Sequence, residues 1–211
     1  YKAAYKKIAE MTRYLRSTGH EISHLDLGGG LGIPYSDESP ADLYAYNQII
    51  VETVGDLDCK LSIEPGRYLV GEAGILITRV IYIKQGDQKK FVIVDGAMND
   101  LIRPTLYDGF HAIVPVTEKN LSFQKSLCDV VGPICESGDY FAKDRMLPEI
   151  SQNDLLAIKF SGAYGAVMAS NYNSRPLIPE VLVSNDAFSV IRKRQTFEKM
   201  MQDEKIAAWL Q

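Results

Sequence analysis

The sequence has 211 residues, of which 46% are hydrophobic and 24% are charged, a composition typical of a globular protein with a packed core. Its formal net charge of -4 argues against a nucleic-acid partner, and no apolar run approaches the ~20 residues of a membrane-spanning helix. The three cysteines are widely spaced and form no Cys-x-x-Cys pair, which favours a reducing cytosol over a disulfide scaffold or a zinc site.

The first predicted element is an amphipathic helix over residues 1–16. Apolar side chains recur there at helical spacing with lysines on the opposite face, and residues 17–19 (Ser-Thr-Gly) end the pattern. The chain starts in this helix without an initiator methionine or a targeting segment. We therefore expect it to be a piece of a longer protein.

A short strand over residues 22–27 is expected next, and it runs directly into Gly28, Gly29, Gly30 and Gly32. Glycines in this arrangement allow positive φ angles and aim several backbone N–H groups at one anion. The dinucleotide pattern G-x-G-x-x-G and the nucleotide P-loop are both absent. A flexible turn is the alternative, but the flanking strand and helix favour a phosphate site for another kind of cofactor.

A second helix–strand unit follows the glycine loop. Ser39 and Pro40 resemble an N-cap and a first helical residue, which predicts a helix to about residue 54, and residues 59–63 form a second strand pattern. This strand ends at Glu64-Pro65-Gly66-Arg67, so parallel pairing would bring that turn beside the glycine loop. Arg67 could then bind an anion held by the loop, although the turn alone would suggest only a solvated arginine. Two such units cannot complete a core, so we expect further ones upstream.

The pattern changes near residue 74, which places a domain boundary near residue 72. A β-branched run over 75–83, a turn at 85–87 and a strand over 91–94 predict a hairpin. The short spacing of the later apolar runs indicates an antiparallel sheet or β-barrel. We expect a closing helix over 197–210, in which Trp209 would act as a docking anchor. The further candidate strands cover residues 112–116, 126–131, 155–158, 180–183 and 188–191.

Arg103 and Tyr107 are four residues apart, so one helical turn would place both side chains on one face, where they would suit a carboxylate. An exposed polar pair is an equally good interpretation of this spacing alone.

A glycine- and proline-bounded loop carries Cys135 beside Glu136. The thiol could be a proton donor or a small buried hydrophobe. Cys59 and Cys128 lie within strand patterns and are assigned to packing.

Tyr164 lies between small residues in Gly162-Ala163-Tyr164-Gly165 and could border a flat ligand, although a structural tyrosine in a tight turn is the alternative. His20, His24 and His111 lack a spacing that suggests a metal site or a catalytic triad, and we interpret them as structural.

Five motifs together resemble the diaminopimelate decarboxylase family of fold type III, alanine-racemase-like decarboxylases, which depend on pyridoxal phosphate (PLP). The resemblance covers residues 25–175, and the five motifs together are far more specific for this family than any one of them alone. The motifs are LDLGGGLGI, EPGRYLV, MNDLIRP-x-LY, GPICESGD and GAYG.

The resemblance implies an α/β part and an all-β part: the last units of a PLP-binding (β/α)8 barrel over residues 1–72, then a C-terminal β-sheet or β-barrel domain over 73–211. It implies that PLP is bound by Gly28, Gly29, Gly30, Glu64, Pro65, Gly66, Arg67 and Tyr164. It implies further that substrate is bound by Arg67, Arg103, Tyr107, Glu136 and Tyr164, with Cys135 as the catalytic proton donor.

The implied reaction converts meso-diaminopimelate to L-lysine and CO2, the last step of lysine biosynthesis, in a cytoplasmic homodimer whose active site lies at the subunit interface. The family's lysine that binds PLP covalently lies upstream of this sequence, so the 211-residue piece alone is expected to be inactive. Alternatives are a related decarboxylase acting on ornithine, arginine or carboxynorspermidine, and a non-catalytic homologue. Neither a metal nor a nucleic-acid or membrane partner is expected.

Overall fold

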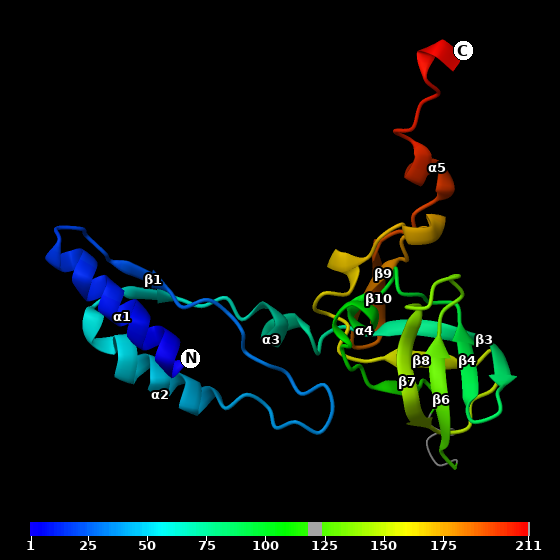
Figure 1. Cartoon of the computed structure of the whole chain (residues 1–211), viewed down its shortest axis with the longest axis horizontal. Helices are drawn as coiled ribbons and strands as arrows, with labels where there is room; N and C mark the ends of the chain where they lie inside the picture. The colour runs from blue at the N-terminus through cyan, green and yellow to red at the C-terminus, as the bar shows by residue number, and fades with distance from the viewer. Residues whose placement is uncertain (118–123, 211) are drawn as a thin grey trace. The chain divides into compact units, whose positions relative to one another are not determined.

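The computed structural model describes residues 1–117 and 124–210, which form two compact units, Tyr1–Ala73 and Gly74–Gln211 (Figure 1). The first unit is an α/β structure and the second is mainly β, and each has its own cluster of buried hydrophobic residues. In the described part of the chain, no helix combines the length and the apolar character needed to cross a bilayer.

The first unit contains two short parallel strands, with His24 opposite Lys60 and Asp26 opposite Ser62. Both strands are shorter than the apolar patterns predicted, but their positions and the helices between them agree with the expected α/β order. The elements are α1 (Lys2–Ser17), β1 (His24–Asp26), α2 (Leu43–Val54), η1 (Gly55–Leu57), β2 (Lys60–Ser62) and α3 (Gly66–Val70).

The predicted start of the second helix at Ser39-Pro40 is wrong. Helix α2 begins at Leu43 because the carboxylate of Asp42 accepts a 2.9 Å hydrogen bond from the backbone N–H of Ala45. An aspartate in this geometry is a strong N-cap, and it satisfies an N–H that the first turn would leave unpaired. The predicted end at residue 54 is confirmed.

A buried cluster holds α1 and α2 against the strands. Tyr5 and Tyr46 are both buried, and their hydroxyl oxygens lie 3.0 Å apart in a hydrogen bond. Burial is the main cause that raises the pKa of Tyr5 above its ordinary range, and the Tyr46 hydrogen bond adds to it. Leu25 in β1 and Leu27 directly after it, on either side of the exposed Asp26, both add their side chains to this cluster.

The second unit is built on a six-stranded sheet with the order β5-β8-β3-β4-β6-β7, and a separate two-stranded hairpin pairs β9 with β10. The bounds predicted for two strands, 126–131 and 155–158, are confirmed. The strands are β3 (Leu76–Gln85), β4 (Lys90–Val94), β5 (Ile113–Pro115), β6 (Ser126–Val131), β7 (Tyr140–Leu147), β8 (Leu155–Ile158), β9 (Glu180–Ser184) and β10 (Ala187–Arg192). The helical elements are α4 (Arg103–Tyr107), η3 (Ala166–Met168), η4 (Tyr172–Ser174), α5 (Phe197–Met201) and η5 (Ala208–Leu210).

The sheet is not antiparallel throughout. Strands β3 and β4 form the predicted hairpin, but β4 pairs in parallel with β6, with Lys90 opposite Cys128 and Ile93 opposite Val131. Short apolar runs give no information on strand direction, so the sequence could not distinguish this pair from an antiparallel one.

Strand β7 was missed because Lys143, Asp144 and Arg145 interrupt its apolar pattern. Asp144 adopts a positive φ of 49° where the β6–β7 register shifts, and its carboxylate binds the ammonium of Lys89 at 2.8 Å. A bulge of this kind moves the charged residues out of the regular alternation while the strand continues.

The predicted closing helix over 197–210 is also wrong. Helix α5 ends at Met201, and within the described residues up to 210 only the short 3-10 turn η5 follows. The polar residues 202–205 separate the two pieces, and a short helix without a buried face gains little stability. Trp209 is 87% exposed, and its role as a docking anchor remains a prediction.

Candidate cofactor and substrate site

Two loops lie side by side at the carboxyl ends of β1 and β2. The backbone N–H of Leu27 donates to the carbonyl of Ser62 at 2.9 Å, and the N–H of Glu64 donates to the carbonyl of Gly28 at 2.8 Å. These bonds continue the parallel pairing of the strands beyond their last residues. The expected placement of the glycine loop beside the Glu64–Arg67 turn is therefore confirmed.

The glycine loop needs its glycines for two different reasons. Gly28 and Gly30 have positive φ angles of 71° and 93°, a conformation that other residues rarely adopt. Gly29 instead packs so closely that a Cβ atom there would overlap the carbonyl oxygen of Glu64. Gly32 has open space around it, so this fourth glycine is not required by packing.

The loop offers backbone donors to an anion. The N–H of Gly28 is bound to the carboxylate of Asp26 at 2.8 Å, whereas no residue within 1–117 or 124–210 accepts a hydrogen bond from the N–H of Gly29 or Gly30. Consecutive residues with such N–H groups form the concave surface that binds phosphates in many proteins. These residues fit a phosphate group.

Arg67 follows the loop contact at Glu64 by three residues and is the second residue of the short helix α3. Its side chain is half-buried, and its guanidinium carbon lies 6.0 Å from the centre of the Tyr35 ring. The cation also acts on the phenol of Tyr1: burial raises the pKa of Tyr1, Tyr46 adds to this rise, and Arg67 opposes it. Arg67 therefore brings a fixed positive charge to the unit that carries the glycine loop.

In the second unit, α4 carries Arg103 at its first residue and Tyr107 at its last, as the four-residue spacing predicted. The interpretation as an exposed polar pair is wrong for Arg103, which is only 9% exposed, whereas Tyr107 is 61% exposed. The guanidinium Nη1 of Arg103 lies 2.9 Å from Nε2 of His111, which is fully buried. Arg103 is therefore held by the protein interior.

The loop that carries Cys135 and Glu136 is organised by a buried carboxylate. Asp139 is buried, and its two oxygens accept hydrogen bonds from the backbone N–H groups of Met98 (2.7 Å) and Ile134 (2.6 Å). Both bonds go to a charged acceptor, which makes them strong. Cys135 and Glu136 themselves are exposed, so the loop presents them to solvent.

The same loop is bound to α4. The hydroxyl of Thr105 donates a short hydrogen bond to the carbonyl of Gly138, and the Gly138 N–H donates to Glu136 Oε1 at 3.1 Å. A Cβ atom on Gly138 would come within 2.7 Å of the Thr105 methyl group, so glycine permits this contact. The helix with Arg103 and the loop with Cys135 thus form one connected structure.

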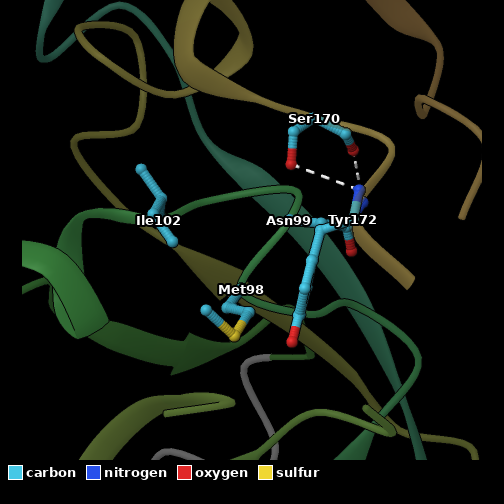
Figure 2. A pocket seen from close by; sticks show the side chains of 5 residues that line it. All are labelled: Met98, Asn99, Ile102, Ser170 and Tyr172. Atoms are coloured by element: carbon cyan, nitrogen blue, oxygen red, sulfur yellow. Dashed lines mark hydrogen bonds between the residues drawn. The ribbon is translucent and has the colours of Figure 1, made fainter. Parts of the chain in front are cut away.

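Tyr164 lies in its predicted loop with a positive φ of 58°, and its side chain is 47% exposed. Further along, the hydroxyl of Tyr172 lies 3.5 Å from Glu136 Oε2. Tyr172 also lines a pocket of about 240 Å³, shown in Figure 2, in which hydrogen bonds join Ser170 to its neighbours. The other lining residues are Met98, Asn99, Ile102 and Ser170.

The predicted site residues fall into two groups. The glycines and the Glu64–Arg67 turn belong to the first unit, whereas Arg103, Tyr107, Cys135, Glu136 and Tyr164 belong to the second. Within the described ranges, no group of three histidine, cysteine or acidic side chains could hold a metal ion.

Sequence reasoning missed two supporting residues. His111 was interpreted as structural because no metal or triad spacing accompanies it, and no role was predicted for Asp139. An aspartate within a glycine-rich turn can bind neighbouring backbone N–H groups, and this is the signal that could have identified Asp139. No sequence signal joins His111 to Arg103.

Comparison with known proteins gives a consistent picture. The model of the family "Pyridoxal-dependent decarboxylase, C-terminal sheet domain" matches residues 22–162. Diaminopimelate decarboxylase from Zymomonas mobilis is 47% identical over 100% of this chain and 50% of its own length. The corresponding protein of Neisseria meningitidis serogroup A is 48% identical over 95% of this chain and 49% of its own.

A solved structure agrees with these relatives. The crystal structure of diaminopimelate decarboxylase from Helicobacter pylori complexed with L-lysine has a TM-score of 0.88 and 44% identity, and it covers 95% of this chain and 49% of that one. The chain spans about half the length of the curated relatives it matches.

Proposed function

Because the chain belongs to the pyridoxal-dependent decarboxylases, we propose that it is the C-terminal part of a diaminopimelate decarboxylase. The full-length enzyme converts meso-diaminopimelate to L-lysine and CO2, and the isolated piece is inactive. The observation that carries the proposal is the hydrogen-bonded pair of loops at Gly28–Gly30 and Glu64–Arg67, because it fits the phosphate of PLP.

In this proposal the first unit completes the PLP-binding barrel. The N–H groups of Gly29 and Gly30 bind the phosphate, and Arg67 adds a positive charge. The turn residues Glu64, Pro65 and Gly66 lie beside the glycine loop at the same phosphate site, and Gly28 links the two loops through its hydrogen bond with Glu64. PLP, when bound, supplies the electron sink for decarboxylation.

The second unit supplies groups for the substrate. Arg103 and Tyr107 bind the distal carboxylate, Glu136 binds the distal ammonium group, and Tyr164 borders the cofactor and the substrate. Arg67 is the one substrate-binding residue proposed from the first unit. As the bond from Cα to the carboxylate breaks and CO2 leaves, the thiol of Cys135 donates a proton to Cα. The exposed position of Cys135 supports this role, since a buried thiol could not meet a substrate.

The proposal also includes a cytoplasmic homodimer in which Cys135 and Glu136 complete the partner's active site. Light scattering on the full-length protein would give twice the monomer mass. A monomer with full activity would contradict the shared site.

The decisive test is substrate turnover by the full-length protein loaded with PLP. We expect L-lysine release from meso-diaminopimelate and little turnover of ornithine, arginine or carboxynorspermidine. Preference for one of these three would identify a related decarboxylase instead, and a protein that binds PLP without any turnover would be a non-catalytic homologue.

A further inference from the structure

We propose that His111 is a positioning residue that fixes the Arg103 guanidinium for the distal carboxylate of the substrate. The proposal rests on the function given above. It begins from the buried contact between Arg103 Nη1 and His111 Nε2, which are 2.9 Å apart.

The contact determines the tautomer of His111. A guanidinium can only donate hydrogen bonds, so Nε2 of the ring must accept and cannot carry a proton. Nδ1 lies 2.8 Å from the carbonyl oxygen of Lys159 and therefore carries the proton and donates. Both ring nitrogens are thus used, and the imidazole is neutral.

Other elements keep the ring in this position. The backbone carbonyl of His111 accepts a 2.9 Å hydrogen bond from Nη1 of Arg145 on β7, and Lys159 follows the last residue of β8. The N–H of Lys159 also donates to the carbonyl of Ala112 at 2.8 Å. The ring is therefore attached through Nδ1 to the residue that follows β8, while the backbone of His111 is attached to β7, and the ring carries this fixed position to Arg103 at the start of α4.

The charges around the ring favour the neutral form. The guanidinium groups of Arg103 and Arg145 both face His111, and burial adds a larger effect in the same direction, so the pKa of His111 is lowered despite the Lys159 hydrogen bond. Because the acceptor is neutral, the full positive charge of Arg103 is available to bind a carboxylate. An aspartate or glutamate in place of His111 would neutralise that charge. The choice of histidine over aspartate at this position is thus suited to a binding arginine.

Two amide variants separate the two halves of this arrangement. In His111→Gln the amide oxygen can take the place of Nε2 and accept from Arg103, but nothing replaces the Nδ1 donor. In His111→Asn the amide NH2 can take the place of Nδ1 and donate to Lys159, but the side chain is too short to reach Arg103. His20→Asn, on an exposed histidine, is the matched control.

The test measures the full-length PLP-loaded enzyme with meso-diaminopimelate. For His111→Asn we expect KM to rise about tenfold or more with kcat within about threefold, while His111→Gln and His20→Asn stay near the wild type. Inhibition by L-lysine, which keeps the distal carboxylate, should weaken in His111→Asn, whereas inhibition by cadaverine, which lacks it, should not.

The opposite order, with His111→Gln impaired and His111→Asn normal, would show that His111 only anchors strand β8 and would overturn the proposal. Equal effects on L-lysine and cadaverine would do the same. A wild-type enzyme without diaminopimelate turnover would instead refute the proposed function.

A measurement on the wild type covers the case in which neither variant folds. In full-length enzyme labelled with ¹⁵N-histidine, His111 should show a protonated Nδ1 and an unprotonated Nε2 at pH 7. A proton on Nε2 would exclude the hydrogen bond from Arg103 and the proposal with it.

Discussion

The carboxylate of Asp139 accepts a 2.6 Å hydrogen bond from the backbone N–H of Ile134, the residue that precedes Cys135. A second bond, from the N–H of Met98, joins the loop to the segment that leads to Arg103. The position of the proposed proton donor is thus determined by a residue that takes no part in the chemistry.

Replacement of Asp139 by asparagine tests this arrangement. The amide offers one acceptor oxygen in place of two, so one buried N–H loses its partner, which costs about 1–3 kcal/mol. We expect kcat/KM of the full-length enzyme for meso-diaminopimelate to fall about tenfold and its thermal unfolding midpoint to decrease. Asp186→Asn on an exposed turn is the control; equal behaviour of the two variants would remove Asp139 from the supporting structure.

The glycine loop makes a prediction about cofactor affinity. In Gly29→Ala the new methyl group overlaps the carbonyl oxygen of Glu64, so the two loops must separate. We expect PLP binding to the full-length apoenzyme, followed by absorbance, to weaken at least tenfold, equivalent to about 1.4 kcal/mol. Gly32→Ala meets open space and should bind like the wild type; similar weakening in both variants would show that the loop contact is unimportant.

The proton donor can be tested by a single atom change. In Cys135→Ser a hydroxyl of much higher pKa replaces the thiol, and loss of a general acid typically costs about 10²–10⁴ in rate. We expect kcat for diaminopimelate to fall by at least about 10² with little change in PLP binding. Cys59→Ser is the matched control, and unchanged turnover in Cys135→Ser would assign the proton to another group.

The buried His111 predicts how stability depends on pH. Its pKa is lowered in the folded protein, mainly by burial, so the unfolded chain binds a proton first as the pH falls. Its contribution to stability is complete above about pH 6.5 and is lost as the pH falls from there through the folded-state pKa. For one proton the slope cannot exceed about 1.4 kcal/mol per pH unit.

The measurement compares the unfolding of full-length wild type and His111→Asn between pH 7.5 and 5. The wild type should lose stability more steeply, because asparagine does not titrate. Parallel curves would mean that His111 has the same pKa in the folded and unfolded states.

Local patterns predicted much of the fold. Strands β6 and β8 were predicted to the residue, and α1 nearly so, because short apolar runs and amphipathic spacing depend on neighbouring residues alone. The start of α2 was wrong because Ser39 and Asp42 are both good caps, and only the folded backbone selects Asp42. Strand β7 was not predicted because the bulge at Asp144 lets the strand continue through three charged residues, and a bulge cannot be recognised from the alternation of polar and apolar residues.

For the candidate site, the sequence predicted the neighbouring loops but not the contacts that hold the substrate-binding residues in place. The loop pair at Gly28 and Glu64 followed from parallel pairing of adjacent strands, which the sequence supports. His111, which contacts Arg103, is eight residues away and outside the helix, so the burial of Arg103 against it is a tertiary effect. The roles of Cys135 and Glu136 are carried by the family resemblance and remain predictions.

The first glycine and the final aspartate of the Cys135 loop act as one unit. A Cβ atom on Gly132 would overlap the Asp139 carboxylate, so the small residue makes the space that the acid fills. The loop shape thus depends on its ends, while the Cys135 side chain between them is exposed to solvent. A substitution at Cys135 therefore leaves both ends of the loop in place, so that an effect on the proposed proton transfer can be separated from an effect on the loop.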